Sequence, residues 1–204
     1  MTRTLLVTAS VLSAAVFATA QSAQVPPDVD LGDTRGANFD TQAVGTATPA
    51  DFDFLVGTWD FLFQQQAEPG SYRPTQTGVW TVQKTHDSHI VEDVWRLGAT
   101  TNPTITYRIF NPSRKLWEIQ GTKPERGGWD DGIAWSQGNA RYLVQHFNSS
   151  GLLVRIKYFD ITGTSFRWRA DGSSDQGKTW TADIWKMVAT RASAASRTAD
   201  LMAQ

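Results

Sequence analysis

Asp93 and Arg108 are the two charged side chains that strand pairing is expected to bring together in this sequence. Counting residues across three hairpin loops places both in one row, with Trp80 opposite the aspartate, the aspartate opposite the arginine, and the arginine opposite Trp117. Neighbours in such a row lie about 5 Å apart, so the two charges are predicted to pair. The loops that this count assumes are His86-Asp87, Gly98–Pro103 and Asn111–Arg114.

The face that carries this row is the more apolar one, so we expect it to point inward. A buried carboxylate can act as a general acid or base, but a buried charge also requires a partner. The row is therefore an ion pair that only fixes strand register, the polar end of an aromatic pocket, or a catalytic pair. An arginine keeps its aspartate ionised and a poor acid, which weighs against catalysis. The candidate ligand-binding residues are Trp80, Asp93, Trp95, Arg108 and Trp117.

A second cluster of basic residues lies on two later segments, and its face depends on one loop length. With a two-residue loop at Thr162-Gly163, Arg167 lies beside Tyr158. With a three-residue loop, Trp168 takes that place and the arginines turn to the opposite face. Either an inward basic cluster or a basic outer stripe results. The cluster consists of Arg155, Lys157, Arg167 and Arg169.

Other chemistry finds little support in the residue types. The chain has no cysteine, which excludes disulfides and thiolate metal sites. Its 19 Lys and Arg against 20 Asp and Glu lack the basic excess of a nucleic-acid binder. His86 and His89 flank a predicted turn and His146 is remote, so we expect no metal, haem or other cofactor. The segment Ser173–Trp180 fits the Asp-box pattern of sialidase propellers, but a single box predicts a hairpin rather than a glycosidase.

The elements that must position these residues are short strands. Turn clusters rich in Gly, Asn and Asp separate segments rich in aromatic and β-branched residues. About ten consecutive strands joined by short links predict an up-and-down antiparallel β-barrel, which hides the sheet edges. A helical turn over 49–56 precedes the first strand. The predicted strands are 58–66, 77–84, 89–97, 103–110, 115–121, 131–137, 140–147, 152–160, 165–171 and 179–188.

Several motifs resemble a family of exported bacterial lipocalin-like (calycin) proteins, which are largely uncharacterised. Gly57-Thr58-Trp59 resembles the G-x-W signature of these barrels, and Arg191 stands where the family's last strand supplies an arginine that packs on this tryptophan. The resemblance covers 51–191 and implies a lipocalin-like barrel with a general ligand-holding role. The further matching segments are Asp53–Asp60, Ile90–Trp95, Tyr107–Pro112 with Trp117, Ser165–Arg169 and Ser173–Trp180.

The ends of the chain lack the strand pattern. Residues 1–20 combine Arg3, a short apolar stretch and Ala18-Thr19-Ala20, as in a secretory signal peptide. We interpret 21–47 as a flexible linker, 48–191 as the barrel domain and 192–204 as a flexible tail. The mature protein is expected to be periplasmic or secreted, to have no membrane span, and to bind a small, mostly apolar ligand. An enzyme using Asp93 and Arg108 is the alternative, and the oligomeric state is left open.

Overall fold

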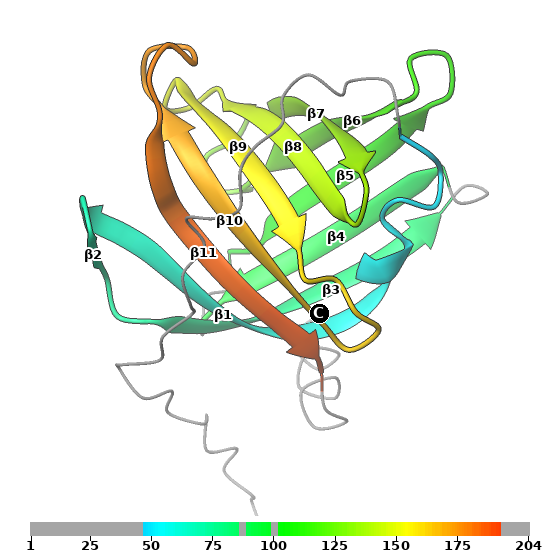
Figure 1. Cartoon of the computed structure of the whole chain (residues 1–204), viewed down its shortest axis with the longest axis horizontal. Coiled ribbons are helices and arrows are strands. Elements are labelled where there is room, and N and C mark those ends of the chain that lie inside the picture. Colours follow the sequence, from blue (N-terminus) through cyan, green and yellow to red (C-terminus); the bar gives the residue numbers. More distant parts are fainter. Residues whose placement is uncertain (1–46, 86–88, 99–101, 193–204) are drawn as a thin grey trace, which may run out of the picture.

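The computed structural model describes residues 47–85, 89–98 and 102–192, in which all strands join one antiparallel sheet (Figure 1). The predicted signal peptide, the linker up to residue 46 and the tail beyond Ala192 lie outside these residues. The elements are η1 (Asp53–Leu55), β1 (Gly57–Glu68), β2 (Ser71–Tyr72), β3 (Gln76–Thr85), β4 (Ile90–Leu97), β5 (Thr104–Asn111), β6 (Leu116–Thr122), β7 (Asp130–Gln137), β8 (Ala140–Phe147), β9 (Leu152–Phe159), β10 (Ser165–Ser173) and β11 (Thr181–Arg191).

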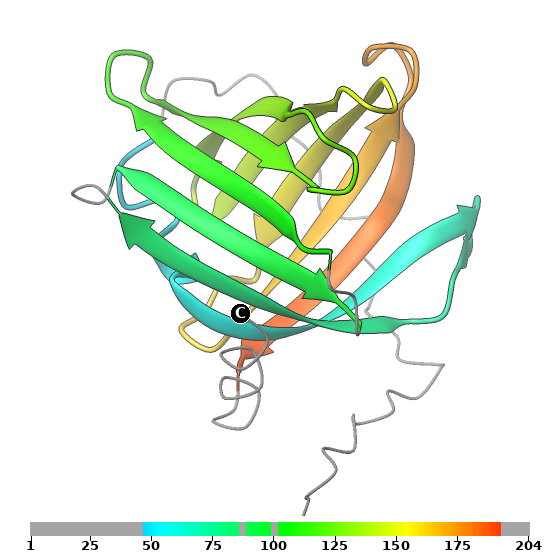
Figure 2. The same ribbon diagram turned by 180° about the vertical axis from the view of Figure 1, so that it is seen from behind.

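The predicted up-and-down barrel is confirmed. Strands from β3 to β11 each pair with the next one along the chain, and β1 pairs with both β3 and β11, which closes a ring of ten strands. Figures 1 and 2 show the strands wound obliquely around a common interior. Inward residues alternate with outward ones, as in the buried Trp59, Phe61 and Phe63 of β1. No helix in the described ranges is long and apolar enough to cross a membrane.

Strand β2 is the element that the sequence did not predict. It is two residues long and pairs with the far end of β1, past the last contact between β1 and β11. A register shift interrupts this pairing between Gln66 and Glu68. The resulting hairpin projects away from the barrel wall (Figure 2). So short a strand carries no alternating pattern that a sequence could reveal.

The start of β1 and the end of β11 are joined at one end of the barrel, as the resemblance implied. Trp59 is fully buried, and the guanidinium carbon of Arg191 lies 3.8 Å from its ring centroid. The same guanidinium donates hydrogen bonds to the carbonyls of Val56, Phe54 and Gly163. Gly57 has φ +119°, and a Cβ there would lie 2.5 Å from Nη1 of Arg191. Glycine is therefore required at the first position of the G-x-W motif.

A short segment before β1 covers this closed end. The side chain of Asp51 accepts hydrogen bonds from the backbone amide and the hydroxyl of Thr48, at 2.8 and 2.9 Å. This is the reciprocal half of a capping box, and the turn it stabilises leads into η1. Phe52 and Leu55 are fully buried, as expected for residues that close the barrel. Where the sequence predicted one helical turn over 49–56, residues 49–52 form turns and Asp53–Leu55 form a 3₁₀ helix.

The predicted register of three strand pairs is wrong by two residues in each case. Trp80 pairs with Trp95, Asp93 with Thr106 and Arg108 with Ile119. Between β3 and β4 the chain uses a four-residue connection instead of two, since Thr85 pairs with Ile90. The predicted loop Gly98–Pro103 would pair Leu97 with Thr104, but Thr104 pairs with Trp95, and β4 continues to Leu97 beyond this last pair. The β5–β6 turn is shifted one residue along, to 112–115, because Asn111 pairs with Leu116.

A shift by two residues leaves every side chain on its predicted face, because side chains along a strand alternate with period two. Asp93 and Arg108 therefore still point inward, and both are buried. Arg108 lies diagonally across the β4–β5 pair from Asp93 instead of directly opposite it. The long arginine side chain spans this diagonal separation.

Candidate ligand-binding site

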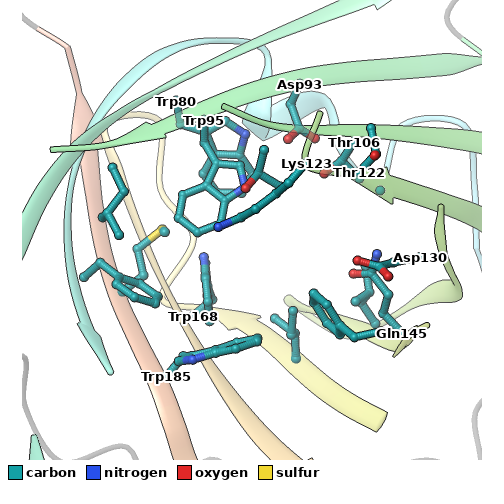
Figure 3. Close-up of a pocket in the computed structure, with 18 of the residues that line it drawn as sticks. Trp80, Asp93, Trp95, Thr106, Thr122, Lys123, Asp130, Gln145, Trp168 and Trp185 are labelled. Carbon is teal, nitrogen blue, oxygen red and sulfur yellow. The ribbon is translucent and has the colours of Figure 1, made fainter. Parts of the chain in front are cut away.

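The barrel encloses a cavity of about 310 Å³ (Figure 3). Its wall is mostly aromatic and aliphatic, with tryptophans from four strands: Trp80 on β3, Trp95 on β4, Trp168 on β10 and Trp185 on β11. Polar side chains form the rest of this wall. They include Asp93, Thr106, Arg108, Lys123, Asp130 and Gln145.

Asp93 and Arg108 form an ion pair at the wall of the cavity. Nη1 of Arg108 contacts Oδ2 of Asp93, and their side chains are 3% and 1% exposed. The predicted burial and pairing of these residues are therefore confirmed. Oδ1 of Asp93 has no hydrogen-bond partner among the described residues. The pair is electrically neutral as a unit and retains one acceptor atom.

The remaining surroundings of Arg108 differ from those predicted. Its guanidinium lies over Phe52 and Trp80, at 5.3 and 5.9 Å from the ring centroids, and Nη2 is 3.4 Å from the hydroxyl of Tyr158. Trp117 was expected beside it but pairs with Phe110. Trp117 instead packs edge-on against Phe52 and donates a hydrogen bond to the carbonyl of Thr48. It belongs to the closed end and is not among the described residues that line the cavity.

The opposite end of the cavity is formed by loops. Lys123 directly follows β6, and its side chain extends into the cavity (Figure 3). Arg126, in the same loop, lies 3.5 Å from Asp130. No carboxylate of the described residues is within ion-pair distance of Lys123, so its charge is not neutralised by this part of the protein. The lining thus contains one more cation than anions: Arg108, Lys123 and Arg126 against Asp93 and Asp130.

Two indole groups in the wall lack hydrogen-bond partners. Nε1 of Trp80 and Nε1 of Trp168 are buried and have no acceptor among the described residues. Both side chains line the cavity and are 4% and 5% exposed. An unsatisfied buried donor costs about 1–3 kcal/mol, so these two groups favour an acceptor brought by a ligand.

The second basic cluster lies on the outside of the barrel. Trp168 pairs with Tyr158 and points inward, which is the arrangement expected from the longer loop at Thr162. The four basic residues therefore share the outer face, and Asp171 and Asp183 neutralise part of it. Arg169 contacts these aspartates at 2.5 and 2.7 Å, and Arg155 contacts Asp171 at 3.0 Å. Burial and the nearby charge of Arg169 lower the pKa of Lys157.

The Asp-box segment forms the hairpin turn between β10 and β11, as predicted. Asp175 accepts hydrogen bonds from the backbone amide and hydroxyl of Thr179 and from the hydroxyl of Ser173. These bonds, led by the amide of Thr179, lower the pKa of Asp175 to about 2. The indole of Trp180 donates to the carbonyl of Gly177. The motif stabilises a turn and presents no pair of carboxylates for glycoside hydrolysis.

Among the described residues, no three His, Asp or Glu side chains are grouped to hold a metal ion. The predicted turn that contains His86 and Asp87 lies outside the described residues. His146 donates to or accepts from the side chain of Asn148 at 2.8 Å.

Sequence reasoning missed several residues of the cavity. Trp168 could have been placed only by choosing the loop length at Thr162. Trp185 follows from the alternation of β11, in which Met187 and Ala189 are buried on the same face. Lys123 follows the end of a strand, where no alternation indicates direction. Loop residues of this kind show no alternation of apolar and polar side chains from which their direction could be predicted.

No family model matches this sequence, and a comparison with curated proteins finds no relative. The barrel fold is therefore the structural observation that bears on the resemblance. A closed antiparallel barrel of ten sequential strands, with a 3₁₀ turn at its closed end, is consistent with a lipocalin-like fold.

Proposed function

We propose that this protein is exported and binds a small, mostly apolar ligand inside its barrel, as a non-catalytic binding module. The cavity of about 310 Å³ is the observation that carries the proposal. Ligand pockets are mostly apolar with a few placed polar groups and begin near about 300 Å³, which fits this interior. The resemblance to exported bacterial lipocalin-like proteins and the signal-peptide pattern of residues 1–20 support the location.

Binding is tested with N-phenyl-1-naphthylamine, a neutral probe whose emission rises in apolar sites. We expect it to bind the purified protein and to quench the tryptophans of the cavity wall. Thr106→Phe places a ring in the cavity and should abolish binding, because Thr106 lines it. Ile105→Phe is the matched control, since the adjacent residue of a strand faces outward. Equal binding by both variants would show that the probe does not enter the barrel.

The natural occupant is sought by native mass spectrometry of protein purified from its own host. A non-covalent mass that is present in the wild type and missing in Thr106→Phe would support the proposal. Protein that is free of ligand in both forms and does not bind the neutral probe would contradict it.

Catalysis by Asp93 is the second candidate, and Oδ1 of Asp93 is the observation that favours it. Asp93 lines the cavity, and this buried atom has no hydrogen-bond partner among the described residues. A general base must accept a proton from its substrate, and a carboxylate oxygen that accepts no other hydrogen bond is well suited to do so. The contact with Arg108 opposes this role, because it stabilises the ionised carboxylate on its other oxygen. Turnover of a ligand identified by mass spectrometry, lost in Asp93→Asn, would favour the enzyme.

A further inference from the structure

We propose that the ligand is a monoanion whose charged oxygen group binds Lys123 near the open end of the cavity, with its apolar body against the tryptophans. This inference rests on the proposed binding function and names the chemical class of the ligand. It places the anion at Lys123 and not at Arg108, the one cation among the predicted ligand-binding residues.

Arg108 is a poor binding site for a ligand anion because Asp93 already neutralises its charge. Asp93 contacts its guanidinium, and both side chains are almost completely buried. An incoming anion at this position would place a second negative charge beside Asp93. The repulsion between the two anions in a dry site would oppose binding.

Lys123 has the opposite properties. Its side chain enters the cavity from the β6–β7 loop (Figure 3), it is half-buried, and no carboxylate of the described residues pairs with it. The nearby Arg126 already lies 3.5 Å from Asp130. Lys123 is therefore the cation that gives the cavity lining its net charge of +1. One uncompensated ammonium group favours a ligand with one negative charge.

The indole donors provide a second and independent observation. Nε1 of Trp168 is buried and unpartnered in the cavity wall, as is Nε1 of Trp80. A ligand made only of hydrocarbon would leave both donors unsatisfied. An oxygen group held by the flexible Lys123 side chain can also accept from an indole N–H, so charge and hydrogen bonding favour the same kind of ligand.

A matched pair of probes separates the charge from the apolar body. The dye 1-anilinonaphthalene-8-sulfonate has the skeleton of N-phenyl-1-naphthylamine plus one sulfonate group. In Lys123→Gln, which keeps the length of most of the side chain, we expect the sulfonate dye to bind about tenfold more weakly. The neutral dye should bind within about twofold of the wild type, because its contacts are apolar.

Three further variants complete the test. Lys123→Arg should retain binding of the sulfonate dye, since it keeps the charge. Lys178→Gln removes a cation from an exposed turn and should change neither affinity, which controls for net charge. Trp168→Phe removes the indole donor and keeps a ring, so it should weaken the sulfonate dye more than the neutral one. Thermal unfolding of each variant confirms that it is folded.

Two results of the dye titrations would overturn the inference while the proposed function stands. One is neutral-dye binding with a sulfonate affinity that Lys123→Gln leaves unchanged. The other is an equal loss of both dyes, which would mean that the lysine only packs against the ligand. Failure of the neutral dye to bind the wild type would instead contradict the proposed function itself. The head group is then identified by displacing the neutral dye with decanoate, decyl phosphate or decanol, which carry a carboxylate, a phosphate and an uncharged hydroxyl. If decanol displaces the dye most strongly, the inference is also overturned.

Discussion

Arg191 packs its guanidinium over the indole of Trp59, and so connects the last strand of the barrel to the first. The contact is reinforced by hydrogen bonds from the same guanidinium to three backbone carbonyls. Residues far apart in the sequence thereby hold the seam of the barrel at its closed end. We therefore expect both side chains to contribute to the stability of the closed end.

Trp59→Ala should destabilise the fold by about 3–5 kcal/mol, because it leaves a cavity in a fully buried aromatic cluster. Arg191→Lys removes the forked donors and should cost about 1–3 kcal/mol. Urea unfolding followed by circular dichroism measures both changes. Arg114→Lys, at an exposed ion pair, is the control and should stay within about 0.5 kcal/mol. A seam variant as stable as this control would contradict the role assigned to Arg191.

Arg108→Leu should cost about 3–5 kcal/mol, since it leaves Asp93 buried without a partner. The double change Asp93→Asn with Arg108→Gln removes both charges and should cost less than the sum of the single changes. A double-mutant cycle of unfolding free energies measures the coupling. If the folded double variant still binds the neutral dye, the ion pair has only a structural role. If it no longer binds the dye, the ion pair contributes to ligand binding.

Arg169→Leu should also destabilise the fold, by about 3 kcal/mol, because Asp171 and Asp183 lose a shared partner. Its effect on ligands should differ from that of Arg108, since Arg169 lies on the outer face of β10. Dye titration of the folded variant at low temperature should give the wild-type affinity. A loss of affinity equal to that of an inward substitution would show that the outer cluster affects the cavity.

Asp175 should titrate with a pKa of about 2 in the folded protein. An unfolded aspartate titrates near about 3.9, so the folded pKa is the lower one. The stabilising bonds of the hairpin are therefore complete above about pH 4 and are lost as the pH falls through about 2. Carboxyl chemical shifts followed by NMR measure this value directly. Thr179→Val should raise the pKa of Asp175, although the backbone amide of residue 179 still donates, and an unchanged value would contradict the assignment.

The barrel and the inward face of Asp93 and Arg108 could be predicted from the sequence because both depend on alternation. Alternation repeats every two residues, so a register error of two residues in each strand pair left Asp93 on its predicted face and paired with Arg108. Exact neighbours were lost, because the length and position of a hairpin turn depend on local backbone geometry. Lys115, for example, has φ +49° in the β5–β6 turn, a conformation that its residue type does not suggest.

The open end of the cavity could not be predicted in the same way. Lys123 and Arg126 belong to a loop, and their directions are set by the turn that the loop adopts. The amide of Arg126 donates to the carbonyl of Lys123, which fixes a turn that no alternating pattern indicates. The charge balance of the interior therefore emerges only when the loop residues are placed in three dimensions.

The pairing of β1 with β11 also determines when this chain can fold. One edge of β1 has no partner until the residues around Trp185–Arg191 have been synthesised, so the barrel cannot close on a nascent chain. Contacts between such distant segments slow folding, and open strand edges promote aggregation in the meantime. A chain truncated before the β11 segment that pairs with β1 should therefore accumulate in inclusion bodies, whereas the full chain should remain in the supernatant. If the protein is exported as an unfolded chain, as the proposed function implies, late closure would keep the chain competent for translocation.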